Sequence, residues 1–386
     1  MNHKKESYIL MFSKWYPNKM DPQFGVFIQK QALAISGKRD IVVYSSHAHS
    51  DANEKLFSLE INHFGKLKEY RMYYRKNSSV FSPLLNLFRY LMAWQKAKKI
   101  ILKENGIPSV AHAYILLRPA ILAYLFSLTH RIPFVISEQW SGYTNGKFTE
   151  RPAIVKWLSK FVFRKAMAIT AVSQFLKTNM QNLGFSGSIK VIPNVIEIQK
   201  PKITTKDEKI NMLVVADLVD EIKNISGIIQ AYSELIKQLP MLRLRIIGHG
   251  KDEIKLKELA LKLEVPENTI HFDGLKNNAE VYEALWDCDF LIMNSRFETF
   301  SLICAEALSC GKPVIATRCG GPEEFIDSSN GILIPVNDTD ALKAAILQMS
   351  KNYSNYSPEQ LRNQAAKQFN SESVGNSFDL VYSTLT

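Results

Sequence analysis

Two carboxylates separated by seven residues mark the stretch Ser295-Arg296-Phe297-Glu298-Thr299-Phe300-Ser301-Leu302-Ile303-Cys304-Ala305-Glu306-Ala307-Leu308-Ser309-Cys310-Gly311-Lys312-Pro313. It follows an apolar run, Phe290–Met293, that predicts a buried strand, and from about Ser301 its apolar residues recur with helical spacing. Glu298 is therefore expected before the helix and Glu306 within it. At about 1.5 Å per helical residue, the two carboxylates are on the order of 10 Å apart.

A helix N-terminus is expected between these two carboxylates. The free N–H groups of Phe300, Ser301 and Leu302 would favour an anion there. A ligand with a sugar at one end, a pyrophosphate in the middle and a ribose at the other matches all three features. Glu298 would accept hydrogen bonds from sugar hydroxyls, and Glu306 from ribose hydroxyls. Taken alone, the segment also fits an ordinary strand-loop-helix unit with a surface glutamate and a helix glutamate.

The length of 386 residues predicts two domains of roughly 190 residues each. In both halves short apolar runs alternate with helical patterns, which is typical of parallel α/β sheets. The expected strands are Tyr8–Phe12, Ile41–Tyr44, Ser109–Ala113, Phe134–Ser137, Ala168–Val172, Lys190–Ile192, Ile210–Ala216, Leu242–Ile247, Thr269–Phe272, Phe290–Met293, Val314–Ala316 and Gly331–Ile334.

The polar, Lys-rich stretch Glu197–Lys209 predicts a linker. We therefore expect a first domain over residues 1–196 and a second over residues 197–370. The last helix is expected over roughly Ser357–Thr386, and its final part, residues 371–386, is a candidate to cross back to the first domain. Two domains of this class leave a cleft between the carboxyl ends of their strands, where ligands bind.

The charge is divided unequally along the chain. Residues 1–200 hold 29 Lys and Arg against 11 Asp and Glu, a net charge of +18, whereas residues 201–386 carry −7. The excess predicts an anionic partner for the first half, such as a membrane surface, a lipid phosphate or nucleic acid. Two basic, partly apolar helices are candidate surfaces, one opened by Ser82-Pro83 and one over Lys156–Lys165. Alternatively, each packs its apolar face on the sheet and leaves its lysines in solvent.

The expected compartment is the cytosol, with peripheral binding to the inner face of a membrane as an option. No apolar run approaches the roughly eighteen residues that a spanning helix needs, and Tyr8–Phe12 is too short for a secretory segment. The four cysteines form no C-x-x-C pair, so we expect reduced, buried thiols. His47 and His49 have no acidic companion nearby, which favours a solvated loop over a metal site.

With these elements placed, the chain resembles the retaining glycosyltransferases of the group 1 type, family four. The resemblance covers nearly the whole chain and implies two Rossmann-like domains facing each other across a cleft, the GT-B fold. Its markers, in chain order, are Val191–Asn194, Val214–Lys223, Ile246–Gly250, Phe272–Gly274, Ser295–Pro313 and Thr317–Glu324.

The resemblance implies a role for each matching residue. Glu298 and Glu306 fall on the family's E-x7-E carboxylates, the first near the transferred sugar and the second at the ribose. Lys223 falls on the lysine that neutralises the donor pyrophosphate. The usual arginine partner of that lysine is replaced by Asp217, which cannot bind phosphate. The implied donor-binding set is Gly25, Lys223, Glu298, Thr299, Phe300, Ser301, Leu302 and Glu306.

The first half supplies the remaining implied site residues. Gly25 corresponds to a glycine that lets the backbone approach the donor phosphate, although a plain turn glycine is the alternative. His112, expected just past the strand Ser109–Ala113, matches a histidine that reaches the donor sugar. Glu138, Gln139 and Trp140 follow the next strand and are expected to line the acceptor pocket, although a buried tryptophan is more often part of a core.

The resulting functional expectation is a retaining glycosyltransferase. It would move a sugar from a nucleoside-diphosphate sugar to a hydroxyl of a lipid-linked or growing saccharide, with Glu298, His112 and Lys223 as catalytic residues and no metal or other cofactor. One rival is a sugar-nucleotide epimerase or a hydrolase of the same fold. The other is a non-catalytic protein that binds an anionic surface; the absence of RRM, KH or zinc patterns argues against nucleic acid as its ligand.

Overall fold

The computed structural model describes residues 7–77, 82–202 and 208–385. Contacts divide the chain into two compact units. The N-terminal unit comprises residues Met1–Val172, Lys177–Val195 and Ser371–Thr386, and the C-terminal unit comprises Ser173–Leu176 and Ile196–Asn370. The chain changes unit between Val195 and Ile196, next to the expected linker, of which residues 203–207 lie outside the described part.

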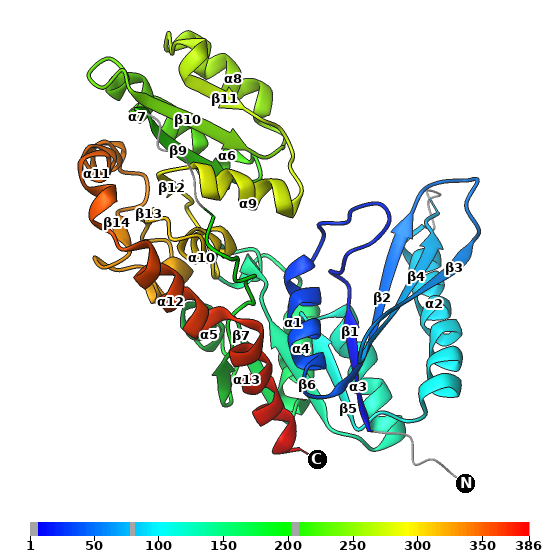
Figure 1. Ribbon diagram of the computed structural model, residues 1–386. Coiled ribbons are helices and arrows are strands. Elements are labelled where there is room, and N and C mark those ends of the chain that lie inside the picture. Colours follow the sequence, from blue (N-terminus) through cyan, green and yellow to red (C-terminus); the bar gives the residue numbers. More distant parts are fainter. Residues whose placement is uncertain (1–6, 78–81, 203–207, 386) are drawn as a thin grey trace. The chain divides into compact units, whose positions relative to one another are not determined.

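An eight-stranded sheet forms the centre of the N-terminal unit, in the order β3-β4-β2-β1-β5-β6-β7-β8 (Figure 1). All neighbours are parallel except β3 and β4, which form an antiparallel pair. The strands are β1 (Tyr8–Ser13), β2 (Asp40–His49), β3 (Phe57–Phe64), β4 (Leu67–Arg75), β5 (Val110–Tyr114), β6 (Phe134–Glu138), β7 (Ala168–Ala171) and β8 (Ile189–Val191).

Helices cover both faces of this sheet, and β1 is therefore buried on both sides. Ile9 and Met11 pack into a cluster with the helices α1 and α13, whereas Phe12 points the other way, its ring 5.0 Å from that of Trp94 on α2. The helical elements of the unit are α1 (Val26–Ser36), α2 (Ser82–Asn105), α3 (Arg118–His130), η1 (Ser141–Tyr143), α4 (Ala153–Lys165), α13 (Ser371–Ser383) and, from Lys177 on, α5 (Gln174–Asn182).

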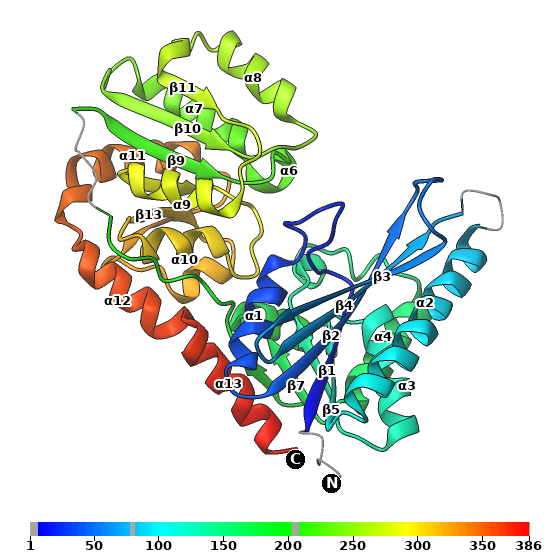
Figure 2. The same ribbon diagram turned by 45° about the vertical axis from the view of Figure 1, so that its right-hand side comes forward.

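The C-terminal unit is built on a six-stranded, fully parallel sheet in the order β11-β10-β9-β12-β13-β14 (Figure 2). Its strands are β9 (Ile210–Val215), β10 (Leu242–Ile247), β11 (Ile270–Phe272), β12 (Phe290–Met293), β13 (Val314–Thr317) and β14 (Gly331–Ile334). Its helices are α6 (Asp220–Lys223), α7 (Ile225–Leu235), α8 (Glu253–Lys262), η2 (Glu267–Thr269), α9 (Asn278–Asp287), α10 (Leu302–Ser309), η3 (Gly321–Glu324), α11 (Thr339–Asn352), η4 (Tyr353–Asn355) and α12 (Pro358–Phe369).

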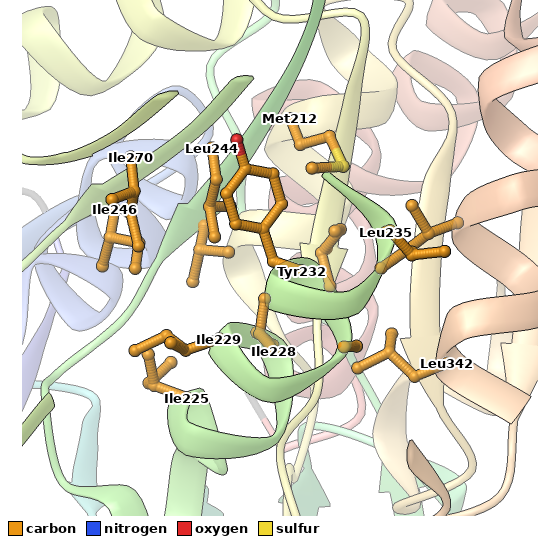
Figure 3. Packing of buried hydrophobic residues seen from close by; sticks show 14 of the residues in the cluster. Met212, Ile225, Ile228, Ile229, Tyr232, Leu235, Leu244, Ile246, Ile270 and Leu342 are labelled. Carbon is orange, nitrogen blue, oxygen red and sulfur yellow. The ribbon is translucent and has the colours of Figure 1, made fainter. Parts of the chain in front are cut away.

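The core of this unit forms where α7 packs its apolar side against β9 and β10 (Figure 3). Ile228 and Ile229 are fully buried there, and burial of such a side chain stabilises the fold by about 1.5–3 kcal/mol. Tyr232 is buried as well, and its hydroxyl donates to the carbonyl oxygens of Leu242 and Thr269, at 3.1 and 2.8 Å. The phenol thus ties α7 to β10 and to the turn before β11.

The expected α/β class with two parallel sheets is confirmed, but three local predictions are wrong. The pair β3–β4 was missed. His47 and His49 do not lie in a solvated loop: they are buried on β2, which continues to His49 because β4 pairs with it as far as Arg75. The single last helix is two helices, because Asn370 is extended and separates α12 from α13.

The four cysteines are free and buried, as predicted. Across the described part of the chain, no helix is both long enough and apolar enough to span a bilayer.

Among the parallel strands of each sheet there is one point at which the strand order reverses. In the N-terminal unit β1 lies between β2 and β5, and in the C-terminal unit β9 lies between β10 and β12. Open parallel sheets bind ligands outside the carboxyl ends of the strands at such a point. Ligand-binding loops are therefore expected after β1 and β5 in the N-terminal unit and after β9 and β12 in the C-terminal unit.

Candidate active site

An ion pair lies at the reversal point of the C-terminal sheet. Lys223 ends α6 in the connection after β9, and Glu298 lies in the loop after β12. The Lys223 Nζ donates to Glu298 Oε1 at 2.5 Å, and the hydroxyl of Ser295 donates to the same oxygen at 2.9 Å. The lysine and glutamate side chains are 22% and 17% exposed. A cation and a carboxylate thus lie side by side, and both side chains are partly exposed.

The surroundings of Lys223 favour its charged form. Burial acts to lower the pKa of the ammonium, but the charge and hydrogen bond of Glu298, together with the nearby Asp217, outweigh it and raise the pKa above the ordinary value of 10.5. Lys223 therefore carries its positive charge throughout the neutral range.

Arg296 holds the turn that carries Lys223. Its Nη1 donates to the carbonyl oxygen of Asp220 at 2.5 Å, and its Nη2 donates to Oδ1 of Asn224 at 2.9 Å. Its backbone N–H donates to the carbonyl oxygen of Ile222 at 2.7 Å. The planar guanidinium thus fixes α6, a helix of only four residues, against the loop after β12. Sequence analysis missed this role; the signal available was an arginine two residues before the first carboxylate.

The backbone of Glu298 is held from its other side by the loop after β13. The Glu298 N–H donates to the carbonyl oxygen of Cys319 at 3.3 Å, and the Gly321 N–H donates to that of Glu298 at 2.9 Å. A Cβ atom on Gly321 would lie 2.5 Å from backbone atoms of Thr299 and Phe300, so only glycine permits this approach. Gly321 therefore helps to position the carboxylate-bearing loop.

The remaining predicted donor residues surround the start of α10, which begins at Leu302 as expected. Ser301 is the N-cap, in a left-handed conformation with φ of 71°. Phe300 is buried and Thr299 is partly exposed. Glu306 lies within the helix and is 7% exposed. Burial raises the pKa of the Tyr282 hydroxyl, and the charge of Glu306 raises it further.

Gly25 starts α1 with a left-handed backbone, φ of 72°. A Cβ atom here would lie 2.4 Å from the carbonyl carbon of Trp15 and 2.7 Å from the backbone nitrogen of Tyr16. The glycine is therefore required by its contact with the loop after β1. Its predicted contact with a donor phosphate remains a prediction.

The predicted placement of His112 is wrong. It lies inside β5, not past its end, and is fully buried. The alternation of the strand puts it on the face covered by α13, where its Nδ1 lies 2.6 Å from the hydroxyl of Tyr382 and its Nε2 lies 2.7 Å from that of Ser137. Burial lowers the pKa of the imidazole to about 3, so the ring is neutral. These contacts make His112 a structural anchor.

Glu138 does not line a pocket, in contrast to the prediction. It is fully buried, and its two carboxylate oxygens accept from the N–H groups of Leu116, Gln139 and Trp140 and from the hydroxyl of Tyr143, at 2.9–3.1 Å. Burial raises the pKa of this carboxyl despite the four donors. Glu138 thus joins the loop after β5 to the loop after β6.

The other two predicted acceptor residues differ in exposure. Gln139 is buried, and its side chain donates to Oε1 of Gln31 at 3.0 Å. Trp140 is partly exposed and lines a surface pocket at the carboxyl edge of the N-terminal sheet. Of the three, only Trp140 is placed where a small molecule can touch it.

Comparison with known protein families matches both halves of the chain. The sequence model described as "Glycosyl transferases group 1" matches residues 195–368, and "Glycosyltransferase Family 4" matches residues 32–200. The chain belongs to the group 1 glycosyltransferases.

Individual relatives match parts of this glycosyltransferase. It is 28% identical to N-acetyl-alpha-D-glucosaminyl L-malate synthase of Bacillus anthracis over 42% of each chain. It is 26% identical to an uncharacterised glycosyltransferase of Methanocaldococcus jannaschii over 70% of this chain and 74% of the relative. A lipopolysaccharide core biosynthesis glycosyltransferase of Rhizobium meliloti is 25% identical, over 48% and 55%. The chain thus spans about half the length of the first and third of these relatives.

Solved structures agree on the fold. Sucrose-phosphate synthase from Thermosynechococcus elongatus has a TM-score of 0.76 at 17% identity, over 98% of this chain and 99% of that one. Anabaena HepE in complex with UDP has a TM-score of 0.71 at 16% identity, over 98% and 100%. The GT-B assignment is confirmed.

Within this family Asp217 remains a departure. It follows β9, is exposed, and is close enough to raise the pKa of Lys223. A negative charge therefore stands where the resemblance implies a second cation. Lys223 has no arginine partner at that position.

In the part of the chain that the structure describes, no three His, Cys, Asp or Glu side chains are grouped so as to hold a metal ion. That transfer needs no metal remains a prediction.

Proposed function

We propose that this glycosyltransferase transfers a sugar from a nucleoside-diphosphate sugar to a hydroxyl of a saccharide or glycolipid acceptor, with retention of the anomeric configuration. The observation that carries the proposal is the Lys223–Glu298 pair at the reversal point of the C-terminal sheet. A site for a nucleoside-diphosphate sugar needs a cation to bind the diphosphate. It also needs, close to that cation, a hydrogen-bond acceptor for the hydroxyls of the sugar. Lys223 supplies the cation and Glu298 supplies the hydrogen-bond acceptor, and the two side chains are hydrogen-bonded to each other.

In the proposed mechanism Lys223 binds the diphosphate and offsets the charge that develops on it as the glycosidic bond breaks. The N–H groups at the start of α10 contribute in the same direction. Glu298 accepts hydrogen bonds from the sugar, and Glu306 accepts them from the ribose. Because Arg296 and the loop after β13 already hold this geometry, little reorganisation is needed when the donor binds.

The donor to test first is a UDP-sugar, because the structurally similar HepE was solved with UDP and with UDP-glucose. Relatives are named for lipopolysaccharide core biosynthesis and for alpha-monoglucosyldiacylglycerol synthesis. These names support a saccharide or glycolipid as the acceptor.

Thermal stabilisation by UDP, GDP and ADP, and by their glucose conjugates, tests the donor assignment. A ligand at a hundred times its Kd stabilises the folded state by about 2.7 kcal/mol, which raises the melting temperature. We expect Lys223→Met to abolish the effect of the true donor. Lys237→Met is the matched control, because Lys237 is an exposed lysine of the same unit. Equal stabilisation of both variants, or stabilisation by no nucleotide, would contradict the proposal.

Product analysis separates transfer from the rival reactions. With labelled donor and an acceptor mixture, we expect label in a glycoside whose anomeric configuration, read by NMR, matches that of the donor. An epimerase would yield a new sugar nucleotide without any acceptor, and a hydrolase would release free sugar at the same rate with and without acceptor. Inversion at the anomeric carbon would refute only the retaining mechanism and would leave the proposed transfer of a sugar intact.

We also propose that the N-terminal unit binds an anionic membrane surface through α2. Its exposed side chains include Leu84, Leu87, Phe88 and Leu91, which are 72%, 45%, 59% and 42% exposed. Positions 84, 87, 88 and 91 share one helical face. Lys96, Lys99 and Lys103 follow on the same helix, and the first half of the chain carries the excess of +18. Apolar and basic residues together are typical of a helix that lies on a membrane.

A further inference from the structure

A small pocket of about 240 Å³ lies at the reversal point of the N-terminal sheet. Lys14 and Trp15 reach it from the loop after β1, Ile115–Pro119 from the loop after β5, and Trp140 and Arg151 from the segment after β6. All of these residues belong to one unit. The pocket therefore occupies the position at which an open parallel sheet binds a ligand.

The charged residues that line this pocket are all cations: Lys14, Arg118 and Arg151. No carboxylate lines it, and within residues 7–77, 82–202 and 208–385 none of the three cations forms an ion pair. Arg151 lies over the ring of Trp140 at 5.5 Å, and Arg118 lies over that of Tyr90 at 5.9 Å. The nearby Glu138 is fully buried, and its carboxylate oxygens are engaged by four other donors.

The cations are close enough to affect one another. Partial burial lowers the pKa of Lys14, and the positive charges of Arg118, Lys76 and Arg151 lower it further. Like charges gathered without a counter-charge destabilise the ligand-free protein, and a bound anion relieves that repulsion.

The loop after β5 is strained where it lines the pocket. Ile115 and Leu117 have positive φ angles of 69° and 88°, which are unusual for aliphatic residues and most of all for the β-branched Ile115. The Ile115 N–H donates to the carbonyl oxygen of Ser137 at 2.8 Å, and that of Leu116 donates to Glu138. Strain of this kind persists where the surrounding structure enforces it, often at a ligand site. Here it sets Arg118 at the first position of α3 beside the pocket.

We propose that this pocket binds a phosphate or carboxylate group of the acceptor, so that the acceptor is an anionic molecule. The inference rests on the proposed transferase function, which assigns the donor diphosphate to Lys223 in the other unit. Trp15 and Trp140 provide apolar wall on either side of the cations, as in small-molecule sites with a few polar groups. The part of the acceptor that is bonded to the phosphate or carboxylate would pack against Trp15 and Trp140.

Calorimetric titration of the full-length protein tests the pocket, with inorganic phosphate and glycerol 3-phosphate as anionic probes and glycerol as the neutral one. We expect binding of both anions and none of glycerol. Arg118→Gln and Arg151→Gln should each weaken anion binding about tenfold or more, because each removes a charged hydrogen-bond donor. Lys38→Gln is the control for net charge, since Lys38 is exposed between α1 and β2 and does not line the pocket. All variants should keep the affinity for UDP of the unmodified protein.

Two outcomes would overturn the inference. If Arg118→Gln and Arg151→Gln bind the anionic probes as tightly as Lys38→Gln, the pocket is not the anion site. If saturating UDP displaces the probes, the anion site belongs to the donor and not to the acceptor. Binding of the probes at this pocket by a protein that fails to bind any nucleotide would support the pocket and count against the proposed donor site instead, so the two failures are distinguishable.

Discussion

Glu298 shares a hydrogen bond with Lys223 and another with Ser295, and both can persist if its charge alone is removed. We therefore expect Glu298→Gln to lower transfer about tenfold to a hundredfold, the range for loss of a charged hydrogen bond. The stability loss should stay near 1 kcal/mol. Rates with saturating donor and thermal melts measure the two effects. Glu359→Gln, at an exposed position on α12, is the control, and unchanged transfer by Glu298→Gln would refute the proposed role.

Because His112 is buried with a lowered pKa, we expect it to make protein stability depend on pH and to have no direct effect on catalysis. Its pKa falls from about 6.5 in the unfolded chain to about 3 in the fold. Below pH 6.5 the unfolded state binds a proton that the folded state does not, so the contribution of His112 is lost as the pH falls. His112→Asn should be destabilised at pH 7, and by about 2 kcal/mol less at pH 5. Urea unfolding followed by tryptophan fluorescence reports on this unit, which holds Trp15, Trp94, Trp140 and Trp157. An equal difference at both pH values would contradict the argument.

At the residue scale, the apolar strand followed by a polar loop predicts the position of Glu298, whereas only the family resemblance implies a role for Lys223. The error on His112 is not one of strand length, because residue 112 falls inside the expected strand Ser109–Ala113 as well as inside β5; the alternation of the strand turns its imidazole inward against α13. Arg296 could not be assigned, because its partners Asp220, Ile222 and Asn224 come from a distant segment.

At the scale of elements, α6 depends on Arg296 because four helical residues are too few to be stable alone. Arg296→Lys keeps the charge but loses the planar fork that reaches two acceptors. We expect amide hydrogen exchange over residues 220–224 to become faster and nucleotide affinity to fall about tenfold, with little change in melting temperature. Arg131→Lys, at an exposed position in the other unit, should change none of these. Unaltered exchange in Arg296→Lys would show that α6 is held by other contacts.

The strands that the sequence predicted are short apolar runs buried between two layers of helices, a pattern that needs no partner to be recognised. The pair β3–β4 lacks that pattern. β3 is partly exposed along its length, and β4 places Lys68, Glu69 and Arg71 among its aromatic residues. Glu69 is fully buried and is satisfied by hydrogen bonds from Tyr16, Gln29 and Arg71. The sequence around Glu69 does not predict that it is buried, because two of its hydrogen-bond partners, Tyr16 and Gln29, are distant in the chain.

At the scale of the molecule, the unequal charge along the sequence can be assigned to the two units. Most of the excess of +18 in residues 1–200 belongs to the unit that carries the cationic pocket and the exposed apolar face of α2. The C-terminal half is net acidic, yet it presents Lys223 at the edge of its sheet. The division of charge is therefore consistent with separate tasks, an anionic acceptor and surface for one unit and a nucleotide for the other.

Membrane binding is a property of the whole N-terminal unit, because apolar insertion and positive charge must act together. Burial of one leucine or phenylalanine contributes about 1.5–3 kcal/mol, so the double variant Leu84→Ser/Phe88→Ser should weaken sedimentation with anionic vesicles by more than a hundredfold. Leu380→Ser is the matched control, since Leu380 is 61% exposed on α13. Vesicles of neutral lipid should bind the unmodified protein more weakly than anionic ones. Equal sedimentation of the double variant and the control would exclude α2 as the membrane-binding face.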